Sequence, residues 1–304
     1  MVSKCAFVTI IGRPSVGKST LLNKMCQEKV AIVSTVPQTT RNAIRGIVNR
    51  NSQDENTVQE QLIFIDTPGR HSSEKKMNKK LMDVSSRALA ESDLVLYILD
   101  AFRAPGTEEE EISALLVPYS AKTIVAVNKM DVPGSDFDRA KNFIIQHMPA
   151  LTEKVFFPIS ANTGQGVEAL LDFLFEMAPE GQPLYDSEYY TDQETGFRIS
   201  EIIREQAINR LRQELPHCLY VDIADMEMKE DGKTLWVRAF IIVERESQKG
   251  MVVGKGGEMI KAIRLSSLKE LKKIFDWKID LDLRVKTAKD WRQKDHTLKR
   301  LIER

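Results

Sequence analysis

The chain has 304 residues, of which 42% are hydrophobic and 29% are charged, a length that predicts two domains and a composition that supports packed cores with a polar surface. The 44 basic and 44 acidic residues cancel overall, but residues 1–197 carry 20 basic and 26 acidic side chains, whereas residues 198–304 carry 24 and 18. This asymmetry predicts a polyanionic partner for the C-terminal part, although an ordinary solvated helical surface would give the same count.

The first predicted strand covers residues 4–11, an apolar and β-branched run, and a phosphate-binding motif follows it directly. Residues 12–19, Gly-Arg-Pro-Ser-Val-Gly-Lys-Ser, have the Walker A spacing, and Leu21, Leu22 and Met25 then fall at helical spacing. Backbone N–H groups at such a helix start hold phosphate, Lys18 reaches the β and γ phosphates, and the Ser19 hydroxyl binds magnesium. We therefore predict that the chain binds a nucleoside triphosphate through Gly12, Arg13, Pro14, Ser15, Val16, Gly17, Lys18, Ser19 and Thr20.

Two further segments are predicted to sense the γ-phosphate. Residues 37–41, Pro-Gln-Thr-Thr-Arg, place Thr40 where a first switch supplies a magnesium ligand, although a plain polar loop is the alternative for this stretch in isolation. Strands predicted over 43–49 and 61–66 form a hairpin, and the second ends in Asp66-Thr67-Pro68-Gly69. Asp66 would partner the magnesium directly or in its second shell, and the Gly69 amide can approach the γ-phosphate because no side chain blocks it.

The rest of the first domain is predicted to alternate helices and strands, with the base site at the end of one strand. A helix over 79–91, a strand over 94–100, a helix opening at 108–111 and a strand ending at Asn128 lead to Asn128-Lys129-Met130-Asp131. The Asp131 carboxylate can accept from N1–H and the exocyclic amine of guanine, donors that adenine does not offer there, so the nucleotide is GTP. A helix near 137–148 and a last strand and helix ending near Ala178 complete a doubly wound α/β sheet. Ser160 and Ala161, near that last strand, have the form of a segment that closes over the guanine.

A break in the pattern separates the second domain from the first. Pro179-Glu180-Gly181-Gln182-Pro183 marks a linker, so we predict a GTPase domain over 1–178, a linker over 179–195 and a second domain over 196–304. The second domain is predicted to open with a helix beginning at Glu201 and capped by Ser200, followed by strands over 219–226 and 235–243 that a turn at 229–233 joins.

The Gly254–Gly257 loop follows the second of these strands and precedes a basic amphipathic helix. It matches the GXXG signature of KH domains, in which glycines let the backbone approach single-stranded nucleic acid; a tight turn and a second phosphate site are the alternatives. Trp291 could stack a base or could form a terminal hydrophobic staple. The residues expected to contact RNA are Lys249, Gly254, Lys255, Gly256, Gly257 and Lys261.

The four nucleotide motifs together resemble the translation-factor-related GTPases, and Gln-Thr-Thr-Arg with Asp-Thr-Pro-Gly looks most like the Era family. The order of parts, through Gly-Lys-Gly-Gly to Lys289-Asp290-Trp291-Arg292, resembles that family over essentially the whole chain. The resemblance implies a P-loop GTPase domain followed by an α+β KH domain of type II. It also implies binding near the 3′ end of small-subunit ribosomal RNA, a role in maturation of the small ribosomal subunit, and a cytoplasmic monomer. Peripheral membrane contact belongs to the family too, although no anchor in this chain predicts it.

We expect magnesium-dependent GTP hydrolysis by direct attack of water on the γ-phosphate, with catalytic roles for Lys18, Thr40 and Gly69. Arg70 stands where the family has a hydrophobic residue, and no Gln orients the water, so the intrinsic rate should be slow. Arg70 is either a cis arginine for the transition state or a solvated switch residue. Ser15 stands where many of these GTPases have Asn, which argues against potassium activation. The remaining residues expected to contact nucleotide are Thr67, Pro68, Arg70, Lys129 and Met130.

Two other functions stay open at this point. An RNA-binding scaffold could use guanine nucleotide as a structural ligand with negligible hydrolysis, which Arg70 and the missing Gln motivate. A tRNA-modification GTPase is disfavoured, because such proteins carry other appended domains and lack the Gly-Lys-Gly-Gly loop.

The cysteines and the apolar runs predict a reduced, cytosolic environment. Cys5, Cys26 and Cys218 are widely spaced and form no metal-ligand pattern, so we expect reduced packing residues. Lys4 leads directly into the first strand, and no signal peptide is predicted. The apolar run at 94–99 has the length of a strand and is far short of a membrane span.

Overall fold

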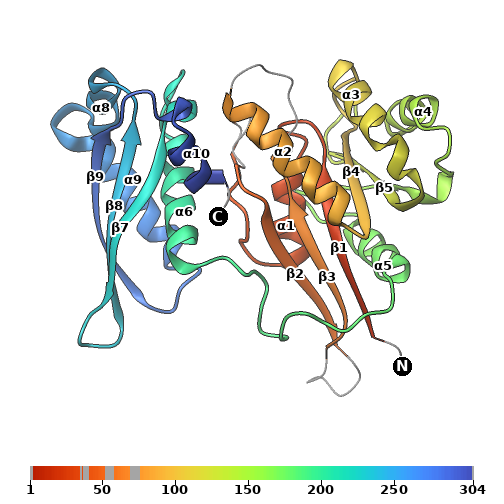
Figure 1. Ribbon diagram of the computed structural model, residues 1–304, viewed down its shortest axis with the longest axis horizontal. Coiled ribbons are helices and arrows are strands. Elements are labelled where there is room, and N and C mark those ends of the chain that lie inside the picture. Colours follow the sequence, from red (N-terminus) through yellow and green to blue (C-terminus); the bar gives the residue numbers. More distant parts are fainter. Residues whose placement is uncertain (1–2, 35, 37–40, 52–57, 69–75, 303–304) are drawn as a thin grey trace. The chain divides into compact units, whose positions relative to one another are not determined.

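The computed structural model describes residues 3–34, 36, 41–51, 58–68 and 76–302 of the chain (Figure 1). These residues divide into two compact units. The first contains the chain up to Ala31 and the region from residue 41 to Asp192, together with the last residues of the C-terminal helix. The second contains the region from Gln193 to Arg300, with residues 32–34 and 36 grouped to it.

The first unit is built on a six-stranded sheet. Its strands are β1 (Lys4–Ile11), β2 (Ile44–Asn51), β3 (Val58–Asp66), β4 (Leu94–Asp100), β5 (Thr123–Asn128) and β6 (Phe156–Pro158). They lie in the order β2-β3-β1-β4-β5-β6; only the β2–β3 hairpin is antiparallel, and the other neighbours are parallel. Every described residue of β4 and β5 is buried, as parallel strands covered on both faces require. The predicted doubly wound α/β sheet is confirmed.

Helices cover both faces of this sheet (Figure 1). The helix α1 (Lys18–Cys26) contacts α5 (Val167–Met177), β2 and β3, whereas α3 (Thr107–Leu116) contacts α4 (Phe137–His147), and α2 (Lys76–Glu91) contacts β1. Two short 3₁₀ segments, η1 (Val117–Lys122) and η2 (Glu153–Val155), precede β5 and β6. The carboxyl ends of the parallel strands meet at one edge, which is where ligands bind in folds of this class.

Residues 179–192, most of the predicted linker, pack against the first unit, and the buried side chain of Gln61 makes three of the hydrogen bonds that hold them. Gln61 of β3 is fully buried; its amide oxygen accepts from the backbone N–H groups of Leu184 (2.8 Å) and Tyr185 (3.1 Å), and its amide nitrogen donates to Tyr185 O (2.8 Å). Further along, Ile47 N donates to Tyr190 O at 2.9 Å. The edge strand β2 therefore gains backbone partners from this segment.

The second unit is a three-stranded sheet with helices. In chain order it contains α6 (Thr195–Ile208), α7 (Leu215–Cys218), β7 (Tyr220–Met228), β8 (Thr234–Val243), α8 (Glu246–Val253), η3 (Lys255–Gly257), α9 (Glu258–Leu271), β9 (Lys278–Thr287) and η4 (Trp291–Gln293), and α10 (Asp295–Ile302) ends the described chain. The strand β8 pairs antiparallel with β7 and parallel with β9. A single core of buried aliphatic side chains from α6, α9 and the three strands joins the helices to the sheet.

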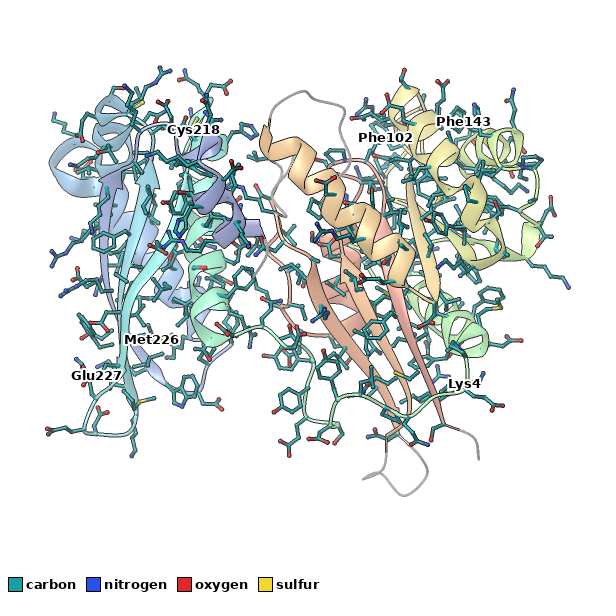
Figure 2. The ribbon with its side chains drawn as sticks, viewed as in Figure 1. Lys4, Phe102, Phe143, Cys218, Met226 and Glu227 are labelled. Atoms are coloured by element: carbon teal, nitrogen blue, oxygen red, sulfur yellow. The ribbon has the colours of Figure 1, made fainter. Side chains whose placement is uncertain are left out.

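The structure corrects the predicted helix cap at Ser200 and decides between the two roles considered for Trp291. Ser200 does not cap a helix, because α6 begins earlier, at Thr195; Ser200 lies inside it and its hydroxyl donates to Phe197 O at 2.7 Å. Trp291 is 1% exposed, its indole N–H donates to Cys218 O (3.1 Å), and its ring lies edge-on to Tyr220. Cys218 lies at the upper end of this unit in Figure 2. Burial excludes base stacking by Trp291 in this structure and favours its packing role.

Candidate functional site

The phosphate loop joins β1 to α1, and its glycines are required by close neighbours. A Cβ at Gly12 would lie 2.6 Å from Ile98 O. Gly17 has φ +105°, and a Cβ there would lie 2.4 Å from Asn128 Nδ2. Side chains at these two positions would clash with β4 and with the base-recognition turn, so only glycine lets the loop pack this closely. The loop then leads into α1, whose first N–H groups lack helical partners and favour anions.

Lys18 is the first residue of α1 and is only 6% exposed. Its Nζ donates to Gly12 O and to Arg13 O, both at 3.0 Å, which fixes the ammonium within the phosphate loop. Burial lowers the pKa of Lys18 from 10.5 to about 8, with Asp66 acting in the opposite direction. A bound polyphosphate would stabilise the charge of this buried ammonium, which lies beside the backbone N–H groups of the phosphate loop.

Nucleotide binding is therefore expected to weaken as the pH rises through 8. Bound phosphates favour the charged ammonium and raise its pKa, so above pH 8 binding must take up a proton that the free protein has lost. The dissociation constant for GDP should increase about fivefold from about pH 7 to about pH 8.7. Calorimetric titration in two buffers of different ionisation enthalpy measures the proton uptake directly. A dissociation constant and a proton count that stay flat over this range would contradict the expectation.

Oxygen donors suited to magnesium lie beside this lysine. The Ser19 hydroxyl lies 2.6 Å from Asp66 Oδ2, and Asp66 is fully buried at the end of β3. A hydroxyl and a carboxylate are the hard oxygen ligands that Mg²⁺ takes alongside phosphate oxygens, so the donor set fits this ion. The neighbouring Thr67 hydroxyl donates to Ile10 O at 2.8 Å, which ties β3 to β1 at this edge. The predicted Thr40, Gly69 and Arg70 lie outside the described residues.

The base-recognition turn follows β5 and is connected to the phosphate loop by Asn128. The Asn128 amide nitrogen donates to Val16 O at 2.9 Å, and its oxygen accepts from Ala161 N at 2.8 Å. Asn128 therefore joins the phosphate loop, the end of β5 and the predicted closing segment. These bonds are a role for Asn128 that the motif alone did not predict.

Asp131 faces the same closing segment. Ser160 Oγ donates to Asp131 Oδ1 at 2.7 Å, and this hydrogen bond lowers the pKa of the carboxyl. Met130 N donates to Ile159 O at 3.1 Å, so backbone bonds hold the turn against the end of β6. The structure thus brings Asn128, Asp131 and Ser160 together at the strand ends, with a charged carboxylate available to a ligand.

A second candidate site is the loop between α8 and α9. Gly254, Gly256 and Gly257 all have positive φ (+76°, +60° and +84°), and a Cβ on Gly254 would lie 2.7 Å from Met259 Cβ. Open space surrounds the Cβ positions of Gly256 and Gly257. Lys255 and Lys261 are exposed on either side, whereas Lys249 lies 3.5 Å from Glu246. The loop thus presents backbone and two lysines to solvent at the positive start of α9.

No helix among the described residues combines the length and the apolar character needed to cross a membrane.

Comparison with known proteins finds a match for each of the two parts of the chain. Residues 7–129 match a family model described as a 50S ribosome-binding GTPase, and residues 214–292 match a KH domain. The GTPase Era of Treponema denticola is 51% identical over 294 residues, covering 97% of this chain and 98% of that protein. The chain belongs to the Era GTPase family. The GTPase Era of Borreliella afzelii is 43% identical, with coverage of 98% and 99%.

Solved Era structures share the whole fold of this family member. An Era complex with MgGDPNP and nucleotides 1506–1542 of 16S ribosomal RNA superposes with a TM-score of 0.90 at 32% identity, covering 99% of this chain and 98% of that one. A variant of Aquifex aeolicus Era bound to GDP and AlF₄⁻ also has a TM-score of 0.90 at 32% identity, covering 98% of each chain. The fold expectation, a P-loop GTPase domain followed by a KH domain, is confirmed, and as an Era-family member the protein is a GTPase.

Proposed function

We propose that this GTPase binds small-subunit ribosomal RNA near its 3′ end through the Gly254–Gly257 loop, and that GTP or GDP sets how it engages the RNA during maturation of the small subunit. The similarity to an Era protein in complex with 16S RNA nucleotides and MgGDPNP supports this. The observation in this chain that carries the proposal is the loop itself, whose glycines leave the backbone accessible between Lys255 and Lys261.

The nucleotide roles follow from the geometry at the strand ends. Lys18 and the phosphate-loop amides would hold the β and γ phosphates, and Ser19 with Asp66 would hold the magnesium, which neutralises charge on the transferred phosphoryl group. Asp131 would accept from the guanine edge while Ser160 orients it. Thr40 and Gly69 remain proposals from the sequence, as do a slow intrinsic rate and weak potassium response.

We assign nucleotide binding to residues 1–178 and RNA binding to residues 196–304. A cytoplasmic location, with peripheral contact to the membrane surface, is part of the same proposal and rests on the family resemblance. The scaffold alternative loses support, because the chain belongs to a family of GTPases.

RNA binding through the glycine loop is tested with a charge reversal. Lys255→Glu should weaken binding to a single strand matching the 3′ end of small-subunit ribosomal RNA by about 10-fold to 100-fold, because it places a carboxylate against the phosphates. It should also reduce the slope of log affinity against log salt by about 1. Fluorescence anisotropy at several salt concentrations, with GDPNP or GDP bound, measures both quantities.

Lys269→Glu is the matched control, since Lys269 is exposed at the other end of α9 and the change in net charge is identical. We expect the control to bind within about twofold of the parent. Equal losses in the two variants would mean that overall charge, and not the loop, governs binding. Equal affinity of the parent for a shuffled RNA would remove the ribosomal assignment.

A further inference from the structure

Arg13 of the phosphate loop and Lys129 of the base turn both bind the carboxylate of Asp100, a residue that belongs to neither motif. Asp100 is the last residue of β4, the strand that lies between β1 and β5 in the sheet. Its Oδ2 accepts from Arg13 Nη2 of the phosphate loop at 2.7 Å and from Lys129 Nζ of the base turn at 2.7 Å. Phe102, two residues further on, lies at the upper edge of this unit in Figure 2, and Lys4 lies at the opposite edge.

The sheet itself produces this arrangement. β1 leads into Arg13, Asp100 is paired in register with Asn128, and Lys129 follows Asn128. Because β1 and β5 flank β4 on opposite sides, a side chain at the end of β4 can reach residues beyond both neighbours. A carboxylate at this position is therefore placed to connect two loops that are 116 residues apart in the chain.

Asp100 is held rigidly and stays charged. Its side chain is 4% exposed and that of Arg13 is 5% exposed. The Oδ1 atom accepts from the backbone N–H groups of Phe102 (3.0 Å) and Arg103 (3.1 Å). Burial alone would raise the pKa of Asp100, but the Lys129 hydrogen bond and these two amides outweigh it, and the net pKa lies below the usual value.

Arg13 contacts a second acidic side chain, Glu109, in addition to Asp100. Lys129 binds Asp100. Glu109 of α3 has its Oε1 atom 2.6 Å from Arg13 Nε, and its Oε2 atom accepts from Gly106 N at 2.9 Å. The Arg13 carbonyl in turn accepts from Lys18 Nζ. A continuous chain of polar contacts thus runs from Lys18 through Arg13 and Asp100 to Lys129.

A nucleotide must be held at its phosphates and at its base simultaneously. If the two binding loops moved independently, binding would have to restrict both, at a cost in conformational entropy. We propose that Asp100 is a positioning residue that fixes the phosphate loop and the base turn relative to each other before the nucleotide binds. This inference rests on the proposed nucleotide site at the strand ends.

A double-mutant cycle tests the proposal. Asp100→Asn keeps the volume and the Oδ1 acceptor but removes the charge, and Lys129→Gln removes the other partner. Each single variant should weaken GDP binding by about tenfold or more. Because both changes break the same link, combining them should add little: the double variant should bind GDP no more than about twofold less tightly than whichever single variant binds it less tightly. The dissociation constant for GDP, measured by displacement of a fluorescent GDP from the full chain, gives all four values.

Asp93→Asn is the matched control, because Asp93 precedes β4 at its other end and its carboxylate likewise accepts a backbone N–H, that of Phe7 at 2.8 Å. It should bind GDP within about twofold of the parent. Losses that multiply in the double variant, or an Asp100→Asn protein that binds GDP as the parent does, overturn the proposal. A parent protein that fails to bind GDP overturns the nucleotide site itself.

If Asp100→Asn does not give folded protein, the cycle of Arg13→Lys with Lys129→Gln replaces it. Both side chains are also expected to contact the nucleotide, but each bonds to the carboxylate that remains, so the part of each effect that passes through Asp100 is shared. The combined loss should therefore be smaller than the product of the two single losses. Multiplying effects in this second cycle count against the proposal.

Discussion

Replacing Lys18 by alanine is expected to lower kcat/KM for GTP by about 10³-fold, which is the loss seen when one preorganised donor is removed from a charged transition state. The ammonium is buried between the Gly12 and Arg13 carbonyls, and the other cation of the loop, Arg13, is already paired with Asp100 and Glu109. Phosphate release under steady-state conditions, with magnesium present, measures the loss.

The same variant should not lose stability. The folded-state pKa of Lys18, about 8, lies below its ordinary value of 10.5, so at pH 7 the buried ammonium opposes folding by about 3 kcal/mol. This opposition is complete below pH 8 and disappears as the pH rises from 8 to 10.5. At pH 7 the free energy of unfolding of Lys18→Ala should therefore equal or exceed that of the parent, as chemical denaturation without nucleotide can show.

Lys24→Ala is the control for this pair of measurements, since Lys24 is exposed near the end of the same helix. It should retain the parent rate. A Lys18→Ala protein that hydrolyses GTP at the parent rate would remove Lys18 from the phosphate site. A large loss of stability would instead mean that the lysine is a structural residue.

Replacing Asp131 by asparagine is expected to exchange guanine specificity for xanthine specificity. The carboxylate can accept from both donors of the guanine edge, whereas the asparagine amide places a donor there that meets the guanine amine and leaves it unsatisfied. GDP affinity should fall by roughly 10³-fold to 10⁴-fold. Xanthosine diphosphate, whose ring carries a carbonyl in place of that amine, should bind the variant better than GDP does. Competition against a fluorescent nucleotide gives both affinities.

Asp138→Asn provides the matched control, because it makes the same chemical change at an exposed residue of α4 whose nearby cation is Lys141. Guanine preference should be unaltered there. If Asp131→Asn also kept its preference for GDP, base recognition would have to come from another part of the strand ends. Ser160, which donates to the Asp131 carboxylate, could still donate to the asparagine oxygen, so the turn itself should persist.

The sequence predicted the motifs because each depends on local chemistry. Gly12 and Gly17 lie where a side chain would clash, and the β-branched run before them forms the buried strand β1. Alternating strands and helices gave the doubly wound sheet, and the glycine loop before a basic helix gave the KH domain. Ser200 was misplaced because its preference for helix caps is weaker than the packing of α6, whose buried face begins before it.

Other features depended on residues that are distant in the sequence. Gln61 belongs to no motif, yet its buried amide holds the segment after Pro183 against the first unit. Trp291 could have stacked a base until the structure placed it beside Tyr220 and under the Cys218 carbonyl.

The amino-acid sequence by itself determined that this protein is a guanine-nucleotide enzyme with an RNA-binding module, because glycine loops, the strands that precede them and base-reading turns depend on residues a few positions apart. The tertiary structure alone decided that Asp100 lies between the phosphate loop and the base turn. Strand order places β4 between β1 and β5, and that order arises from the packing of the whole sheet, which no short stretch of sequence encodes.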